Sequence, residues 1–244
     1  TMPETWLAIY QTEWQSVWAL WVAPLGFLVY SGVLALRKSA PRAGVVPRAA
    51  RFVELFALAF AVETLLDPLC TGPLLRALEI DGTTAGSALS FVFVYLGDFR
   101  VFLLLFGVAA LERGQPLPLA RAAGYACIVP LFAGSVYAGA GAIVGEVSIG
   151  WLWMSYEAAF LALILVLYPR IASSLPTAGA HFVRFVGLYV ATYYALWLGA
   201  DLLIRLGDVD AAWALRILPN QLYYAFFVPC IWWRFFRVRS ASSE

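Results

Sequence analysis

Two carboxylates lie one helical turn apart inside a long apolar stretch of this chain. Glu63 and Asp67 belong to the segment 52–67, FVELFALAFAVETLLD, which is apolar enough to enter a bilayer. A carboxylate in hydrocarbon is costly, so it is expected to face a protein interior and to serve a function. Acid catalysis and the binding of a proton or a hard cation are the chemistries that it offers. We predict Glu63 as a catalytic residue and Asp67 as a binding residue on the same helical face.

Three further polar residues occur at a similar depth in other apolar segments. Measured along helices from the nearest basic anchors, Glu63, Asp98, Glu157 and Asn220 lie roughly 18 to 22 Å into the membrane. In a hydrocarbon core about 30 Å thick, they form one layer just outside the midplane. We therefore predict Asp98 and Glu157 as further catalytic residues, and Asn220 as a binding residue that orients by hydrogen bonding.

Aromatic and charged side chains repeat at helical spacing beside this layer. The pattern predicts a polar pocket in the outer half of the membrane, walled by aromatic rings. Besides Asp67 and Asn220, its predicted binding residues are Tyr156, Tyr194, Trp197, Asp201, Arg216 and Tyr223.

Structural alternatives remain open for several of these residues. Asp201 and Arg205 have the spacing of a simple ion pair, and Arg216 has the length to reach the outer headgroups. Asp98 has two potential partners, Arg216 and Arg100. Glu63 and Glu157 have no obvious cation nearby in the sequence.

The composition defines the class of protein. Of the 244 residues, 63% are hydrophobic and only 13% are charged, which is far too apolar for a soluble domain of this size. We predict an all-α integral membrane protein, a seven-transmembrane-helix bundle that forms a single transmembrane domain over residues 1–244. The predicted spans are 14–36, 52–69, 88–111, 122–144, 149–167, 182–204 and 211–233.

The basic residues predict the orientation of this bundle. With seven spans, 12 of the 16 lysines and arginines fall on one side, which marks that side as cytoplasmic. The N-terminus is then expected outside and the C-terminus in the cytoplasm. The 12 residues are Arg37, Lys38, Arg42, Arg48, Arg51, Arg113, Arg121, Arg170, Arg184, Arg234, Arg237 and Arg239.

Residue counts exclude several chemistries. A net charge of +1 gives no reason to expect nucleic-acid binding, and the three cysteines have no paired spacing. The single histidine excludes a multi-histidine metal site within the chain. The single lysine, Lys38, lies in a predicted loop, so a retinal Schiff base in the last span is excluded. We expect no cofactor and no bound metal.

The remaining enzymatic hypothesis is acid chemistry on an apolar substrate. A protonated carboxylic acid in a dry pocket can protonate an alkene or an epoxide, and aromatic faces then stabilise the carbocation. Here the chain resembles the integral-membrane terpene cyclases of meroterpenoid and indole-terpenoid biosynthesis. AVETLLD places Glu63 in the span where that family carries its glutamate, and NQLYYAFF resembles the last-span motif, with Asn220 where the family has aspartate. The resemblance implies a metal-independent, isoprenoid-converting lyase or isomerase, with Glu63 as proton donor.

Two other classes of function remain open. Polar residues near the midplane are also typical of transporters, so a transporter or a receptor-like ligand-binding protein is one alternative. The other is a structural subunit of a membrane complex. The expected partners are the lipid bilayer and an apolar or amphipathic small molecule, and a membrane-protein partner or homo-oligomer stays open. We expect the protein in a bacterial cytoplasmic (inner) membrane.

Overall fold

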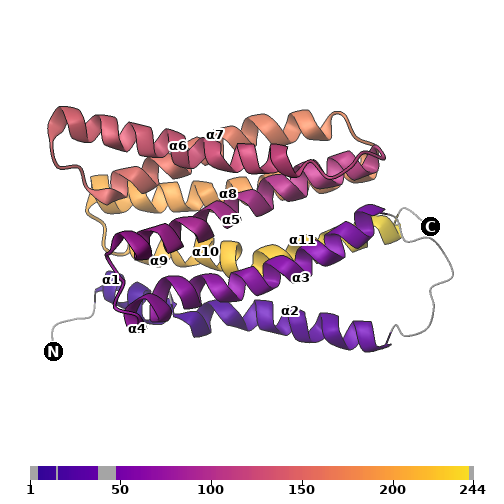
Figure 1. The fold of residues 1–244 in the computed structure, drawn as a ribbon, viewed down its shortest axis with the longest axis horizontal. Coiled ribbons are helices and arrows are strands. Elements are labelled where there is room, and N and C mark those ends of the chain that lie inside the picture. Colours follow the sequence, from indigo (N-terminus) through magenta and orange to yellow (C-terminus); the bar gives the residue numbers. More distant parts are fainter. Residues whose placement is uncertain (1–4, 15, 38–47, 242–244) are drawn as a thin grey trace.

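Long helices run side by side along an elongated bundle (Figure 1). The computed structural model describes residues 5–14, 16–37 and 48–241, and every element in these ranges is a helix. The predicted all-α class is therefore confirmed for the part of the chain that the structure describes. The long helices are α2 (Val17–Arg37), α3 (Arg48–Leu69), α5 (Thr84–Glu112), α6 (Leu119–Val144), α7 (Ile149–Ala172) and α8 (Thr177–Gly207).

The last predicted span is an interrupted helix. It consists of α9 (Ala212–Leu215), α10 (Ile217–Asn220), the π-helix η3 (Gln221–Phe226) and α11 (Phe227–Ala241). Pro219 lies two residues before the π-helix, and proline disturbs a helix because it lacks an N–H group and crowds the preceding turn. The segment predicted as a span over 211–233 is thus divided at Arg216 and becomes π-helical over 221–226, and its crossing of the membrane stays a prediction.

Short helical elements complete one end of the bundle. They are α1 (Trp6–Ile9), the π-helix η1 (Tyr10–Trp14), the π-helix η2 (Cys70–Leu74) and α4 (Leu75–Ala77). The backbone N–H of Trp6 donates to Asp210 Oδ2 at 2.8 Å, which joins the start of α1 to the connection after α8. Thr5 also caps this helix through its side chain. These bonds supply acceptors for N–H groups that the first helical turn leaves unpaired.

Five helical segments are long and apolar enough to cross a membrane by length and composition. They are Trp6–Val33, Thr84–Glu112, Leu119–Val144, Ile149–Ala172 and Thr177–Gly207. α3 and the interrupted segment 212–241 are not among them, although both were expected to be spans. α3 carries five charged residues, Arg48, Arg51, Glu54, Glu63 and Asp67, more than is usual in a membrane span. The finding supports a membrane protein, whereas the count of seven spans stays a prediction.

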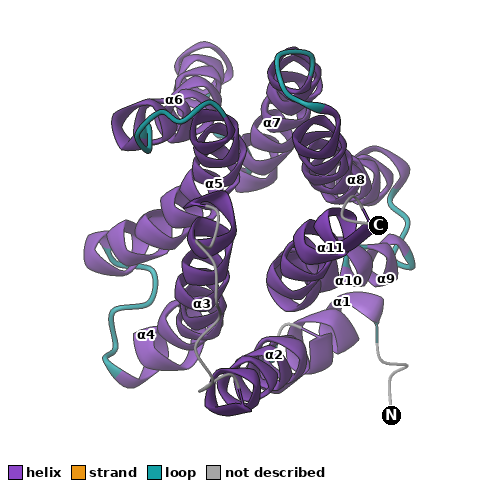
Figure 2. Ribbon diagram, turned by 90° about the vertical axis from the view of Figure 1, so that its right-hand side faces the viewer, coloured by secondary structure: helices purple, strands orange, loops and turns teal. Residues whose placement is uncertain are grey.

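α5 and α11 occupy the interior of the bundle, as the end-on view shows (Figure 2). α5 packs against α3, α6, α7 and α8, and α11 packs against α2, α3 and α8. The run Val101–Ala110 of α5 is buried throughout. Outward-facing side chains are large and apolar, for example Ile143 at 85% and Trp18 at 74% exposure, as expected for a surface in contact with lipid.

The connections separate into two groups at opposite ends of the long axis (Figure 1). The start of α3, the turns 113–118 and 173–176, and the end of α11 lie at one end. α1, α4 and the connections 145–148 and 208–211 lie at the other. The first end contains Arg113, Arg121 and Arg170, and so it corresponds to the predicted cytoplasmic side.

Candidate functional site

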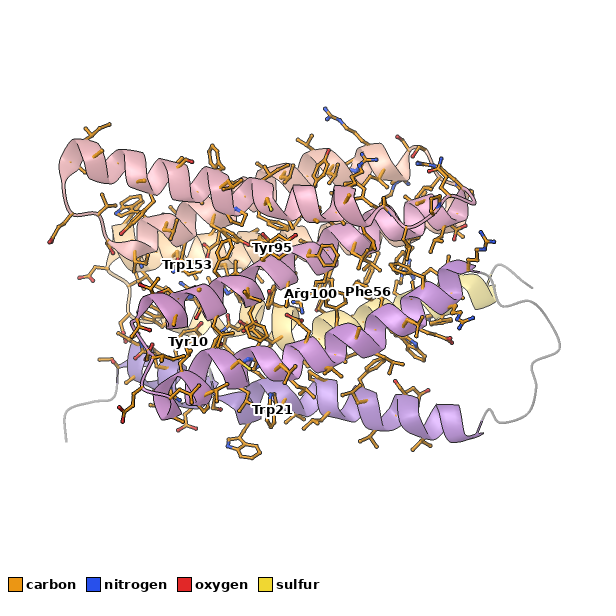
Figure 3. The ribbon with its side chains drawn as sticks, in the orientation of Figure 1. Tyr10, Trp21, Phe56, Tyr95, Arg100 and Trp153 are labelled. Atoms are coloured by element: carbon orange, nitrogen blue, oxygen red, sulfur yellow. The ribbon has the colours of Figure 1, made fainter. Side chains whose placement is uncertain are left out.

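Arg100 of α5 is fully buried at the centre of an inner polar cluster. Its Nη1 lies 3.2 Å from Glu63 Oε2 and donates to Thr64 Oγ1 at 3.2 Å, both on α3. Its Nη2 donates to the backbone carbonyl oxygen of Tyr223 at 2.9 Å. Figure 3 places Arg100 near the middle of the long axis. One guanidinium therefore ties α5 to α3 and to the π-helical part of the last segment.

Aromatic rings enclose the same guanidinium. The Arg100 Cζ lies 4.1 Å from the ring centroid of Tyr223 and 4.8 Å from that of Phe227. Such contacts stabilise a cation most when it is removed from water. Gly97, one turn before Arg100, allows this packing, because a Cβ there would overlap the hydroxyl of Tyr223.

The expectation that Glu63 has no cation nearby is wrong. Arg100 is its partner, and it comes from another helix, so spacing within the second predicted span could not reveal it. Glu63 is 9% exposed, and only its Oε1 lacks a hydrogen-bond partner. The role of Glu63 as proton donor, which the resemblance implies, stays a prediction.

Asp98 lies among tyrosines rather than arginines. Tyr194 donates its hydroxyl to Asp98 Oδ1 at 3.3 Å, and Tyr156 is a second hydrogen-bond partner of this carboxyl group. Asp98 is 1% exposed, and its Oδ2 has no hydrogen-bond partner among the described residues. Phe160 stacks on Tyr194 with ring centroids 4.2 Å apart. Asp98 is thus a buried acid in an aromatic environment.

Arg216, Asp201 and Glu157 form an outer ionic cluster. Arg216, between α9 and α10, pairs closely with Asp201 of α8, and its Nη2 lies 3.9 Å from Glu157 Oε1 on α7. Glu157 therefore also has a cation near it, contrary to expectation. The open pairing of Asp201 with Arg205 is not formed, because Arg205 donates to Ser148 Oγ at 3.2 Å instead. Arg216 turns inward to these carboxylates rather than out to the headgroups.

Asn220 forms hydrogen bonds with aromatic side chains of two other helical segments. Trp197 Nε1 donates to Asn220 Oδ1 at 2.8 Å, and Asn220 Nδ2 donates to the Tyr10 hydroxyl at 2.8 Å. Tyr10 is 2% exposed and packs on Trp213 with ring centroids 5.5 Å apart. Asn220, at the start of the π-helix, is therefore tied to α8 and to the N-terminal segment.

Asp67 forms no salt bridge with another described residue, although its carboxylate interacts electrostatically with Arg100. Thr71 donates its hydroxyl to Asp67 Oδ1 at 3.2 Å, and Tyr224 is another hydrogen-bond partner of the same carboxyl group. Asp67 is 5% exposed. It lies one turn beyond Glu63 on α3, as its spacing predicted, and contacts the last segment through Tyr224.

The structure thus distributes the predicted site residues over clusters instead of around one pocket. Two cavities of the described residues lie at opposite ends of the bundle. One is lined by residues that include Arg113, Arg121 and Arg170, and the other by the turn Gly145–Ser148 and the end of α6. Neither is lined by a predicted site residue. An aromatic-walled cavity around Glu63 is therefore not among these two.

Carboxylates outnumber guanidinium groups in this interior. Within the described residues, the buried carboxylates are Glu63, Asp67, Asp98, Glu157 and Asp201. They face three arginines, Arg100, Arg205 and Arg216. Oxygens of Glu63, Asp98, Glu157 and Asp201 remain without hydrogen-bond partners. Since an uncompensated buried charge is costly, the arrangement suits the uptake of protons or a small cation.

Three contributors were missed by sequence reasoning. Arg100 was considered only as a partner of Asp98, although an arginine within an apolar run is itself a signal. Tyr10 precedes the predicted spans in the sequence, yet it is buried and its hydroxyl accepts a hydrogen bond from Asn220. Nothing in the sequence marks Thr64 as a site residue except its position next to Glu63.

No family model, curated protein or solved structure matches this chain.

Proposed function

We propose that the protein is a seven-span membrane carrier, or a related ligand-binding sensor, whose interior carboxylates bind protons together with a small polar solute or cation. The observation that carries this proposal is the excess of buried carboxylates over arginines beside an interrupted helix. Transporters often hold substrates and coupling ions near the midplane, at helices that are broken there.

The polar side chains converge on the interrupted segment. Arg100 donates to the carbonyl of Tyr223, and Tyr189 donates to the carbonyl of Leu222 at 2.8 Å. Both carbonyls belong to the π-helix. Trp197 and Tyr10 hold Asn220 at its start. Side chains from other helices thus satisfy backbone and amide groups here, which an irregular segment at membrane depth requires.

Protons are the favoured occupant of the excess carboxylates. The described residues bring together no group of three or more His, Cys, Asp or Glu side chains that could hold a metal ion. Asp98 has tyrosine hydroxyls as partners and retains one unpartnered oxygen. A proton on that oxygen removes an uncompensated charge from the interior. We infer that Asp98 is the main proton-binding residue of the carrier.

The seven-span topology belongs to this proposal. α3 and α11 lie between the apolar helices and pack against them, so a membrane around the bundle also encloses these two segments. The basic turns lie at one end of the long axis, and α1 and the end of α11 lie at opposite ends (Figure 1). This arrangement supports an external N-terminus and a cytoplasmic C-terminus.

The direct test is flux in proteoliposomes. Purified protein is reconstituted with an internal pH-sensitive dye, and small cations, amino acids and organic acids are added one at a time. Wild-type protein is expected to move protons with at least one of these solutes. Asp98→Asn is expected to abolish the coupled proton movement, whereas Asp81→Asn, in an exposed connection, is expected to preserve it. A solute flux that Asp98→Asn leaves proton-coupled would contradict the proposal.

A second candidate function is acid-catalysed cyclisation of an isoprenoid, and one observation favours it. Asp98 lies beside the stacked rings of Phe160 and Tyr194, and aromatic faces can stabilise a carbocation. In this hypothesis Asp98 replaces Glu63 as proton donor, since Arg100 pairs with Glu63.

Purified protein supplied with linear prenylated and epoxidised substrates tests this second candidate by mass spectrometry. Asp98→Asn should lower product formation by roughly 10²–10⁴-fold, the usual contribution of general acid catalysis. Glu63→Gln should retain more activity than Asp98→Asn. Conversion that depends on Glu63 but not on Asp98 would return the donor role to Glu63.

A further inference from the structure

The cavity at the predicted cytoplasmic end contains three arginines from three parts of the fold. It has a volume of about 740 Å³ and lies where the end of α5, the turn 113–118, the start of α6 and the end of α7 meet. Arg113, Arg121 and Arg170 line it, together with Ser174. No aspartate or glutamate lines it, so the charge of the cavity is strongly positive.

The three arginines have no acidic partner within the described part of the chain. The salt bridges found there involve Arg100 and Arg216 only. Arg113 donates to the hydroxyl of Ser174, a neutral group. Three guanidinium groups gathered in a cavity without a carboxylate repel one another, and an anion between them relieves that repulsion.

Packing holds part of this charge in place. The Arg121 Cζ lies 4.3 Å from the ring centroid of Phe106 and 5.8 Å from that of Tyr125, and both rings line the cavity. α6 begins at this cavity, and its N-cap residue, Pro118, offers no side-chain cap. The start of a helix carries a partial positive charge, which adds to that of the arginines.

The cavity is amphipathic rather than wholly polar. Leu167 and Ile171 line it beside the arginines, and Leu117 and Leu119 at the start of α6 are exposed next to it. A ligand with a phosphate group and an apolar part matches this combination. Anionic phospholipids have that chemistry, and basic pockets between transmembrane helices on the cytoplasmic side bind their headgroups.

We propose that this cavity is a binding site for a phosphate group, with the headgroup of an anionic phospholipid as the principal source and a soluble phosphate as the other. Arg113, Arg121 and Arg170 bind the phosphate oxygens, and arginine suits this role because its planar fork of donors matches phosphate geometry. This site is separate from the interior carboxylates and does not depend on their function.

The test compares phosphatidylglycerol with phosphatidylcholine in nanodiscs, with bound lipid counted by native mass spectrometry after release. Wild-type protein is expected to retain phosphatidylglycerol preferentially. Each arginine near a membrane surface contributes about fivefold in affinity, so Arg113→Gln/Arg121→Gln/Arg170→Gln should weaken retention by roughly 100-fold. Arg184→Gln is the matched control, because Arg184 is exposed near the start of α8 and does not line the cavity.

Two further measurements separate a loss of binding from a folding defect and identify the source of the phosphate. Arg113→Gln/Arg170→Gln leaves the Arg121–Phe106 contact intact and should still reduce retention clearly, so a folding defect at that contact cannot explain the result. Inorganic phosphate is titrated into protein in phosphatidylcholine nanodiscs by calorimetry. Binding of inorganic phosphate that the arginine substitutions abolish would support the same site, with soluble phosphate as its ligand. Equal retention of both lipids by wild type, together with no phosphate binding, would overturn the proposal, as would a triple variant that behaves like wild type.

Discussion

Arg100 and Glu63 form a buried ion pair between α5 and α3, with 3.2 Å between Nη1 and Oε2. The pair lies beside the π-helical segment, because the same guanidinium also donates to the carbonyl of Tyr223. An interior of this kind is organised by a few charged contacts between helices that are otherwise apolar. The free energy of unfolding of the protein should therefore change strongly when these residues are substituted.

Arg100→Met should destabilise the protein substantially. It leaves Glu63 buried without its cation, and breaking a buried ion pair from one side costs about 3–5 kcal/mol in the free energy of unfolding. Arg100→Met/Glu63→Leu removes both charges and should be less destabilised than Arg100→Met alone. Unfolding in mixed micelles measures these two variants and the single variant Glu63→Leu. Additive losses in the double variant would show that the two residues are not coupled.

Gly97→Ala should disturb the contact between α5 and the last segment. The new Cβ would overlap the Tyr223 hydroxyl, and overpacking of this kind costs about 1–3 kcal/mol. Gly139→Ala on α6 is the matched control, since a Cβ there meets nothing within 4 Å. That change should be neutral or stabilise by up to about 1 kcal/mol. Equal effects of the two substitutions would contradict the described packing of Tyr223.

Asn220→Leu should be more damaging than Asn220→Asp. Leucine removes the acceptor of the Trp197 N–H, and a buried donor left unpaired costs about 1–3 kcal/mol. Aspartate retains an acceptor for Trp197, and the Tyr10 hydroxyl can rotate to donate to its second oxygen. Thermal unfolding in detergent distinguishes the two variants. If aspartate proves the worse substitution, then charge rather than hydrogen bonding governs this position.

Cysteine accessibility tests the seven-span topology. In a background with Cys70, Cys127 and Cys230 replaced by alanine, single cysteines are placed at positions 81, 115 and 208. An impermeant maleimide added to intact cells should label positions 81 and 208 but not position 115. A C-terminal tag should be reached only after permeabilisation. External access to both position 208 and that tag would show that the interrupted last segment does not cross the membrane.

The helical class and most helix positions follow from hydropathy, because an apolar run of about 20 residues has few other stable structures in a membrane. The ends are less predictable. α3 begins at Arg48, whereas the predicted span begins at residue 52, because the helix continues past the hydrocarbon into basic residues. The π-helix after Pro219 has only that proline as a signal, and a proline alone does not specify which irregular geometry follows.

The helix that carries each polar residue is predictable from sequence, but the partner of that residue is not. Asp98 and Arg100 are two positions apart on α5, so their side chains face different neighbours. Asp98 contacts Tyr194 on α8, and Arg100 contacts Glu63 on α3. Helical spacing also predicts an ion pair between Asp201 and Arg205. In the structure Asp201 pairs instead with Arg216, which comes from another segment. Contacts between helices depend on rotation and packing, which spacing within one helix does not contain.

The central claim is that exchangeable protons neutralise the excess carboxylates of the interior, with Asp98 as the main site. Infrared difference spectroscopy between acidic and alkaline buffers, on protein with isotope-labelled aspartate, measures this directly. Wild type should show the carbonyl stretch of a protonated aspartic acid in a dry environment. That band should disappear in Asp98→Asn and persist in Asp81→Asn. A spectrum without such a band, or one that Asp98→Asn leaves unchanged, would contradict the claim.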